Sequence, residues 1–129
     1  MARMKPSSLV FRAMWQLVRF DCGLRFHKFS DVYAKVRNHR IATRDICSPN
    51  ADTICAAVNL ACIWYPHHVL CLQKSLSTTC LLRDFGIPAF MVIGAQCLPF
   101  QAHAWVELEG RVVNDLPYIG EMYAVLDRF

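Results

Sequence analysis

The chain of 129 residues has the length of one domain, and 55% of its residues are hydrophobic, which is enough to form a buried core. The formal net charge of +4 is unevenly distributed along the chain. Residues 1–44 carry ten Lys or Arg against two Asp, whereas residues 45–129 carry four against eight acidic residues. The sequence therefore divides into a basic amino-terminal third and a mildly acidic remainder.

The basic third suggests contact with an acidic partner, an anionic membrane face or nucleic acid. Arg12, Arg19 and Arg25 are the candidate residues for contacts with a partner. The alternative is a solvated helical face that binds nothing.

Seven cysteines without regular spacing do not indicate a disulfide framework. The early apolar segment is interrupted by Arg12 and Arg19, and no small-residue cleavage site follows it. We therefore expect neither a secretory signal nor a transmembrane helix. A cytoplasmic, reduced protein follows, in which most cysteines are small buried hydrophobic residues.

The spacing of apolar residues predicts four helices, at residues 7–21, 30–39, 51–65 and 71–85. Ser7 or Ser8 would cap the first helix and Gly23 would end it, while Ser30 would cap the second. Residues 87–95 are almost continuously apolar, which predicts a buried strand. A hairpin over residues 103–115 completes the expected elements.

The register of this hairpin decides whether His103 and Asp115 can meet. Glu109-Gly110 marks the turn, and a two-residue turn would direct Asp115 away from His103. A three-residue loop over 108–110, with glycine in the left-handed position, would place His103 opposite Asp115. This second register also sets an acidic residue opposite a basic one, so we expect it to form.

Cys71 differs from the other cysteines in its position at the first turn of a predicted helix. The free N–H groups and the positive end of the helix dipole favour a thiolate there. Cys80 lies in the middle of the same helix among leucines, and we expect it to be a packing residue. Cys55 and Cys62 share the apolar face of the preceding helix and are expected in the core.

A nucleophilic triad could be formed by Cys71, His103 and Asp115. In such a triad the histidine takes the thiol proton and the aspartate orients the imidazole ring. The Cys71 backbone N–H would meet the oxyanion with one further donor, for which Trp64 and Tyr65 are candidates. The alternative is that these residues have no catalytic role. His103 would then be an ordinary core histidine, and Asp115 would simply close a turn.

A zinc site is a further alternative, in which His67, His68 and Cys71 would act with another cysteine. The sequence lacks the paired short spacings of known zinc modules, so we expect no metal site.

The motifs CLQKSL, LLRDFGIPA, VIGA, PFQAHAWVE and VVND together resemble the leader peptidases of lasso peptide biosynthesis, a transglutaminase-like cysteine peptidase family. The basic amino-terminal helices and the closing VLDRF also resemble this family, so the similarity covers essentially the whole chain. The resemblance carries the roles of nucleophile, general base and orienting residue onto Cys71, His103 and Asp115.

The resemblance implies hydrolysis of the bond between the leader and the core of a ribosomally made precursor, without cofactor, metal or nucleic acid. It also implies a separate small leader-binding protein, with an ATP-dependent macrolactam cyclase as a further candidate partner. Competing classes are a transglutaminase-like acyltransferase and a non-catalytic scaffold that delivers precursor to the cyclase. The apolar amino-terminal helix could pack on the core, on a partner or on a membrane.

We expect one α+β domain over residues 1–129 of the papain/transglutaminase-like cysteine peptidase class. The basic helical region at 1–44 would precede a catalytic core at 45–129 that ends in a small antiparallel sheet.

Overall fold

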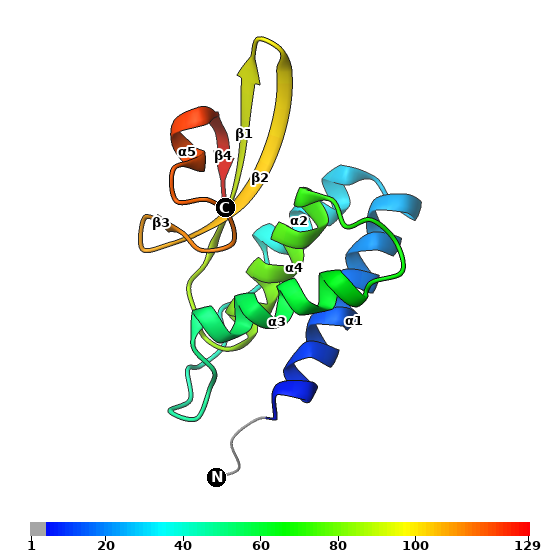
Figure 1. Cartoon of the computed structure of the whole chain (residues 1–129), viewed down its shortest axis with the longest axis vertical. Coiled ribbons are helices and arrows are strands. Elements are labelled where there is room, and N and C mark those ends of the chain that lie inside the picture. The colour runs from blue at the N-terminus through cyan, green and yellow to red at the C-terminus, as the bar shows by residue number, and fades with distance from the viewer. Residues whose placement is uncertain (1–4) are drawn as a thin grey trace.

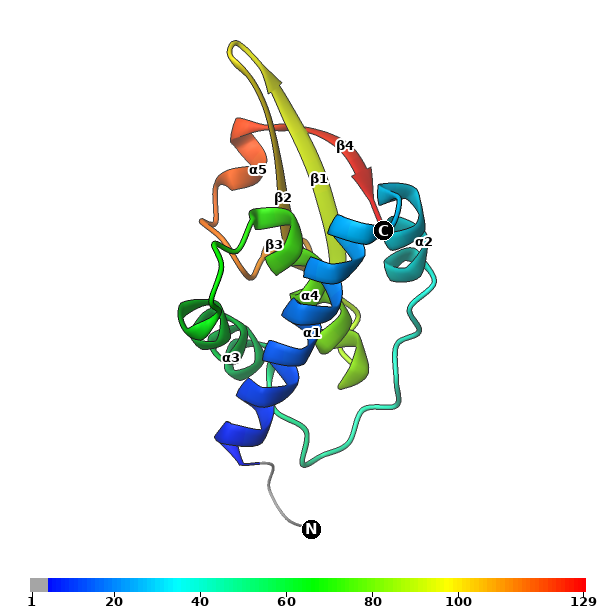
Figure 2. The ribbon, with the colours of Figure 1, turned by 90° about the vertical axis from the view of Figure 1, so that its right-hand side faces the viewer.

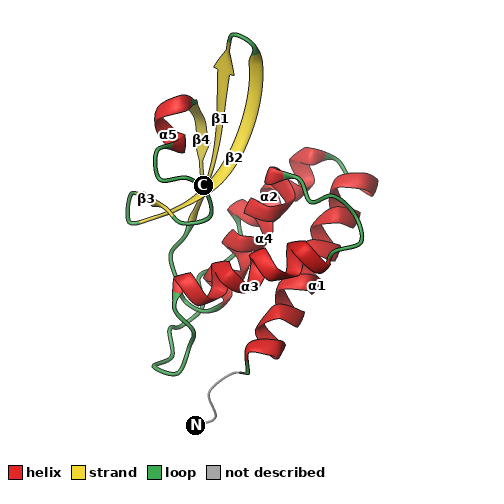
Figure 3. Ribbon diagram, in the orientation of Figure 1, coloured by secondary structure: helices red, strands yellow, loops and turns green. Residues whose placement is uncertain are grey.

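The computed structural model describes residues 5–129 and places a group of helices beside a small sheet (Figure 1). The helices that come first are α1 (Pro6–Phe26), α2 (Phe29–Arg37), α3 (Ala51–Trp64) and α4 (Cys71–Asp84). The remaining elements are β1 (Phe90–Cys97), β2 (Phe100–Leu108), β3 (Arg111–Val112), α5 (Ile119–Met122) and β4 (Ala124–Arg128). Figure 3 shows this separation of helices from strands, which confirms the expected α+β class.

Helix α1 is longer than the sequence predicts, because Gly23 does not end it. The helix begins at Pro6 after Lys5, without a side-chain cap from Ser7 or Ser8, and continues to Phe26. A Cβ atom at Gly23 would lie 3.3 Å from the Val32 side chain of α2. The glycine therefore permits close packing of α2 against α1.

The boundaries of the next three helices lie close to the predicted ones. Helix α2 is preceded by Lys28, so Ser30 lies inside the helix and is not its cap. Asn50 caps α3 by accepting a hydrogen bond from the Thr53 N–H at 2.8 Å. Helix α4 begins at Cys71, as predicted.

The sheet is antiparallel in the order β3-β2-β1-β4, and its hairpin turn differs from our expectation. The predicted three-residue loop is wrong: Glu107 pairs with Val112, which leaves a two-residue turn of Glu109 and Gly110. Both turn residues have positive φ, 53° and 77°, the conformation whose twist matches that of the flanking strands. This geometric fit outweighs the charge pairing on which our prediction relied.

Strand β4 and helix α5 were not among the predicted elements. The strand forms the other edge of the sheet by pairing with β1, and a register shift interrupts this pairing between Ile93 and Gly94. Its short length and almost uniform exposure give a weak pattern in the sequence.

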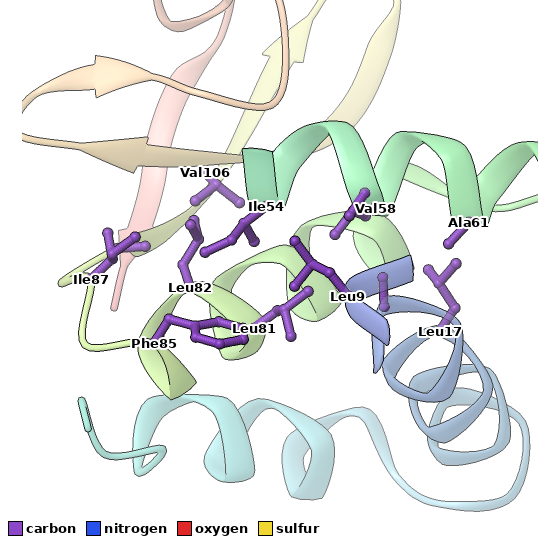
Figure 4. Packing of buried hydrophobic residues seen from close by; sticks show 13 residues of the cluster. Leu9, Leu17, Ile54, Val58, Ala61, Leu81, Leu82, Phe85, Ile87 and Val106 are labelled. Atoms are coloured by element: carbon purple, nitrogen blue, oxygen red, sulfur yellow. The ribbon is translucent and has the colours of Figure 1, made fainter. Parts of the chain in front are cut away.

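The main core lies where α1, α3 and α4 meet one end of the sheet (Figure 4). Leu17 of α1, Val58 of α3, Leu81 of α4 and Val106 of β2 are all fully buried there. Because α4 contributes to the helical core and also packs on β2, it connects the two parts of the molecule.

Seen from the side in Figure 2, the β1–β2 hairpin extends beyond the helices, and α1 lies across the front of the molecule. Among residues 5–129, no helix is both long enough and apolar enough to cross a membrane.

Candidate active site

Cys71 is the first residue of α4 and is half-buried. No acidic residue lies in the first turn of the helix, and Leu70, which precedes the helix, provides no side-chain cap. The free N–H groups at the start of α4 therefore meet no competing carboxylate or side-chain cap.

His103 and Asp115 are in direct contact, with 2.5 Å between Nε2 of the histidine and Oδ2 of the aspartate. The expected contact is thus present, although the register that led us to it is wrong. Strand β3 ends at Val112, and the chain then bends, so that Asp115 reaches His103 from outside the regular sheet. With Nε2 donating to the carboxylate, Nδ1 of the imidazole carries the free lone pair.

A set of buried hydrogen bonds holds the segment before Asp115 against both β2 and α4. Asn114 accepts the Val106 N–H at 2.7 Å and donates to the Ser75 hydroxyl at 3.2 Å. Ser75 in turn donates to the Ala104 carbonyl at 3.0 Å. We call Ser75, Ala104, Val106 and Asn114 the hydrogen-bond clip.

Each part of the candidate triad is close in sequence to a member of the hydrogen-bond clip. Ser75 lies one helical turn after Cys71, Ala104 follows His103, and Asn114 precedes Asp115. Sequence reasoning treated Asn114 only as part of a turn, because nothing local in the sequence signals a contact with α4.

The His103 ring is also held by two aromatic side chains. It stacks on Tyr123, with ring centroids 5.3 Å apart, and on Trp105, with centroids 6.1 Å apart. Gly94, opposite His103 on β1, leaves room for these rings, since a Cβ atom there would lie 2.7 Å from Trp105 and 2.9 Å from Tyr123. The sequence did not indicate these positioning contacts.

Cys71 and His103 line one pocket of about 160 Å³ between α4, β2 and the beginning of α2. The other lining residues are apolar: Phe29, Leu72, Ile93, Ala102 and Ala104. Cys71 and His103 thus border the same small, almost wholly apolar volume.

The remaining buried cysteines are poor nucleophiles. Burial raises the pKa of the Cys80 thiol to about 12 and that of Cys55 to about 11. Burial also raises the pKa of Cys62. Cys55 and Cys80 are buried, as their positions in the sequence indicated, and Cys62 is partly buried against the core.

The two aromatic candidates for an oxyanion donor do not line the Cys71 pocket. The Tyr65 hydroxyl donates to the Asp21 carboxylate at 2.6 Å, and burial together with this bond raises the pKa of Tyr65 to about 12. Trp64 is 72% exposed.

The three arginines proposed for partner contacts lie along α1, outside the Cys71 pocket. Arg25 pairs with Asp21 at 2.9 Å, one helical turn away. The guanidinium of Arg12 lies 4.6 Å from the centre of the Phe85 ring, and that of Arg19 lies 5.5 Å from the centre of the Phe20 ring.

A second histidine–carboxylate pair was not predicted. His39 and Asp84 are 2.6 Å apart, near the carboxyl-terminal ends of α2 and α4. They are far apart in sequence, and no local pattern links the two residues. Within residues 5–129, no group of three or more His, Cys, Asp and Glu side chains is arranged to hold a metal ion.

Comparisons with known proteins place these features in a family. The Microcin J25-processing protein McjB of Escherichia coli is 38% identical over 56 residues, which are 43% of this chain. The match spans only 27% of the length of that relative. No solved structure matches the chain significantly. The profile of the Transglutaminase-like superfamily matches residues 14–128, nearly the full length, and the chain therefore belongs to this superfamily.

Proposed function

We propose that the chain is a cysteine peptidase that removes the leader from the precursor of a lasso peptide. The observation that carries the proposal is the 2.5 Å contact between His103 and Asp115, next to a pocket that His103 shares with Cys71. Membership of the transglutaminase-like superfamily supports a thiol acting on an acyl group. The partial similarity to a Microcin J25-processing protein supports a precursor peptide as the substrate.

In the proposed mechanism, Asp115 accepts the hydrogen bond from Nε2 of His103 and so leaves Nδ1 as the base. Nδ1 removes the proton from the Cys71 thiol as the sulfur attacks the carbonyl of the scissile bond. Asp115 then stabilises the imidazolium through the same bond. The backbone N–H of Cys71, at the start of α4, is the first donor to the oxyanion.

The imidazolium returns its proton to the nitrogen of the leaving group, the C–N bond breaks, and a thioester to Cys71 remains. His103 next removes a proton from water, whose oxygen attacks the thioester. Release of the thiolate, which is reprotonated from the imidazolium, frees the leader with a new carboxylate. Each step uses only protons and electron pairs that the three side chains and water provide.

The direct test incubates the protein, its leader-binding partner and a precursor peptide, and follows the products by mass spectrometry. The proposal expects two fragments whose masses add to that of the precursor plus one water. Cys71→Ala should lower the rate at least about 10³-fold, as loss of a nucleophile does in related devices. Cys47→Ala, at an exposed loop cysteine, is the matched control and should cut as the parent does.

Two results would assign a different function. A product that carries an added amine in place of water would indicate an acyltransferase that uses the same triad. Cleavage by Cys71→Ala at the parental rate would contradict the nucleophile, and leave a scaffold role in which another protein cuts the precursor.

For the implied leader-binding protein, we infer a docking surface along α1. Phe11 and Phe26 are each 78% exposed, and Trp15 is 64% exposed. With Val18 and Cys22 they recur at steps of four, three, four and four residues, which places all five on one face of the helix. We call Phe11, Trp15, Val18, Cys22 and Phe26 the α1 stripe.

The spacing of the α1 stripe suits a helical segment of a partner, which would pack side by side with α1. The three aromatic side chains offer roughly 400 Å² of exposed surface, against about 800 Å² on each side of an ordinary interface. Arg12 and Arg19 follow one edge of the stripe. We therefore propose a partner helix with an apolar ridge and carboxylates along one flank, the apolar contact providing most of the affinity.

Substitutions at two exposed tryptophans test this surface. Trp15→Ala should weaken partner binding at least about tenfold, as interface tryptophans commonly do. Trp64→Ala on α3 removes a residue of similar exposure and should leave the affinity unchanged. Arg12, Arg19 and Arg25 changed together to Glu should weaken binding mainly at low salt. If all these variants bound the partner protein with equal affinity, the proposed surface would be wrong. Binding of the chain to anionic vesicles, abolished among these variants only by Trp15→Ala, would also contradict a protein partner.

A further inference from the structure

Strand β2 has an open edge beside the Cys71 pocket. Strand β3 pairs only with Glu107 and Leu108, at the far end of β2. In the sheet order β3-β2-β1-β4, no other strand of residues 5–129 lies on that side of β2. The edge from Phe100 to Ala104 therefore has no strand neighbour in the described part of the chain.

Three hydrogen bonds define which backbone groups point to this open edge. The Val106 N–H donates to Asn114 and the Val106 carbonyl accepts from Val113, both on the side away from β1. The Ala104 carbonyl accepts from Ser75 on the same side. Backbone groups alternate along a strand, and the register of β2 with β1 is continuous here. The Ala104 N–H and both backbone groups of Ala102 therefore point to the side of β2 away from β1, where Ala102 is exposed and Ala104 is 4% exposed.

The pocket at this edge is apolar and of limited size. Ala102 and Ala104 line it together with Phe29, and Cys71 and His103 also border it. Its volume of about 160 Å³ is close to that of engineered cavities, about 150 Å³, that hold one benzene molecule. It can therefore take one aliphatic side chain, and a charged side chain would lose its hydration there.

We propose that the substrate peptide binds as an added strand on the edge of β2 at Ala102 and Ala104, with one aliphatic side chain in this pocket. Backbone hydrogen bonds would fix the extended peptide, and the pocket would select the side chain next to the scissile bond. The proposal rests on the proposed peptidase function, because it assumes that Cys71 meets a peptide carbonyl.

Peptide aldehydes test this binding mode without a precursor or a partner protein. The Cys71 thiol adds to the aldehyde carbonyl, its proton passes to the oxygen, and the hemithioacetal protects the sulfur from iodoacetamide. We would use acetylated tetrapeptide aldehydes of glycine that carry one leucine, moved from position to position. Leucine at one position should improve protection about tenfold or more, as burial of one leucine side chain does. Aspartate at that position should remove the gain.

Methylation of single backbone nitrogens in the best aldehyde then tests strand addition. Only every second N–H of an added strand faces β2. N-methylation at those residues should weaken protection about tenfold each. N-methylation at the residues between them should change protection less than about twofold. Ala102→Leu should fill the pocket and reduce the leucine preference below about threefold. Phe100→Ala, on the same strand but outside the pocket lining, should retain the preference.

Uniform effects of all methyl groups, or equal protection by leucine and aspartate aldehydes, would overturn the inference. Its failure is separate from failure of the proposed function. If the precursor is cut but the methyl scan shows no alternation, only the binding mode is wrong. If alternation is found and no precursor is cut, the binding mode stands and the leader peptidase function is wrong.

Discussion

Residues 5–129 contain two histidine–carboxylate pairs of nearly the same geometry. In the first, His103 and Asp115 are 2.5 Å apart with side chains 21% and 25% exposed; in the second, His39 and Asp84 are 2.6 Å apart with 21% and 26% exposed. By distance and burial alone, the two pairs cannot be distinguished. Their surroundings separate them.

His103 of the first pair lines an apolar pocket together with Cys71, which begins a helix. The second pair lies near the carboxyl-terminal end of that same helix, one turn after Cys80. Burial raises the pKa of the Cys80 thiol to about 12, so this cysteine remains protonated. Asp84 also faces the guanidinium of Arg12 at 4.0 Å. His39 also lines a cavity, of about 600 Å³, so an open volume does not separate the pairs. A histidine–carboxylate pair indicates catalysis only where a reactive group accompanies it.

The largest expected difference between the pairs is in activity. Asp115→Asn should lower kcat/KM by about 10³- to 10⁴-fold, because the amide no longer fixes the tautomer of His103 or balances its charge. Asp84→Asn should change kcat/KM less than about twofold and lower the stability by about 1 kcal/mol, as expected for a partly exposed pair. Peptide cleavage and urea unfolding of both variants measure this, and equal losses of activity would end the distinction.

The aromatic contacts of His103 provide the next test, since they have no counterpart around His39. Gly94→Ala would place a methyl group 2.7 Å from Trp105, which is fully buried, and should cost about 1–3 kcal/mol of stability. The displaced rings should also lower kcat. Gly120→Ala is the control, because its methyl group would lie 3.9 Å from the same Trp105 in ordinary contact. Thermal unfolding that is identical for the two variants would contradict this packing.

The hydrogen-bond clip is expected to have a similar or smaller effect. Asn114→Ala would leave the buried Val106 N–H without an acceptor, at a cost of about 1–3 kcal/mol, and would free the segment that carries Asp115. Asn114→Asp keeps the acceptor and loses only the donor to Ser75, so it should be less damaging. Both the stability from chemical denaturation and kcat should decrease from the parent to Asn114→Asp and then to Asn114→Ala. An Ala variant as active as the parent would contradict a positioning role.

The smallest effect concerns alkaline pH and the environment of Cys80. Its pKa rises from 9.0 to about 12 on folding, so between these values the folded chain binds more protons than the unfolded chain. Stability should therefore be complete below pH 9 and fall as the pH rises toward 12. Cys55 and Tyr65 act in the same direction. The midpoint of urea unfolding at pH 9 and at pH 11 measures this loss of stability. Cys80→Ala should make the difference between the two midpoints smaller. A midpoint that rises with pH would contradict the prediction.

The helices could be predicted from the sequence because their apolar spacing and start residues are local. The error at Gly23 arose because a glycine that would normally end a helix is needed there for the packing of α2. The hairpin error arose because the twist of a Glu-Gly turn outweighed an exposed charge pair.

Of the candidate site, the position of Cys71 could be predicted from the sequence, whereas the contact of His103 with Asp115 was expected from a hairpin register that is wrong. The hydrogen-bond clip, the stacking of Tyr123 and the pair of His39 with Asp84 could not be predicted. Each joins residues from elements that meet only in the folded chain, and no local pattern marks them.

The most direct test of the central claim relates the activity to the chemical state of Cys71. The native protein is treated with iodoacetamide for increasing times, and each sample is divided between a peptide-cleavage assay and peptide mapping by mass spectrometry. We predict that residual activity falls in proportion to the alkylated fraction of Cys71 and reaches zero when that fraction is complete, while Cys80 stays unmodified. Full alkylation of Cys71 with activity retained would contradict its role as the nucleophile.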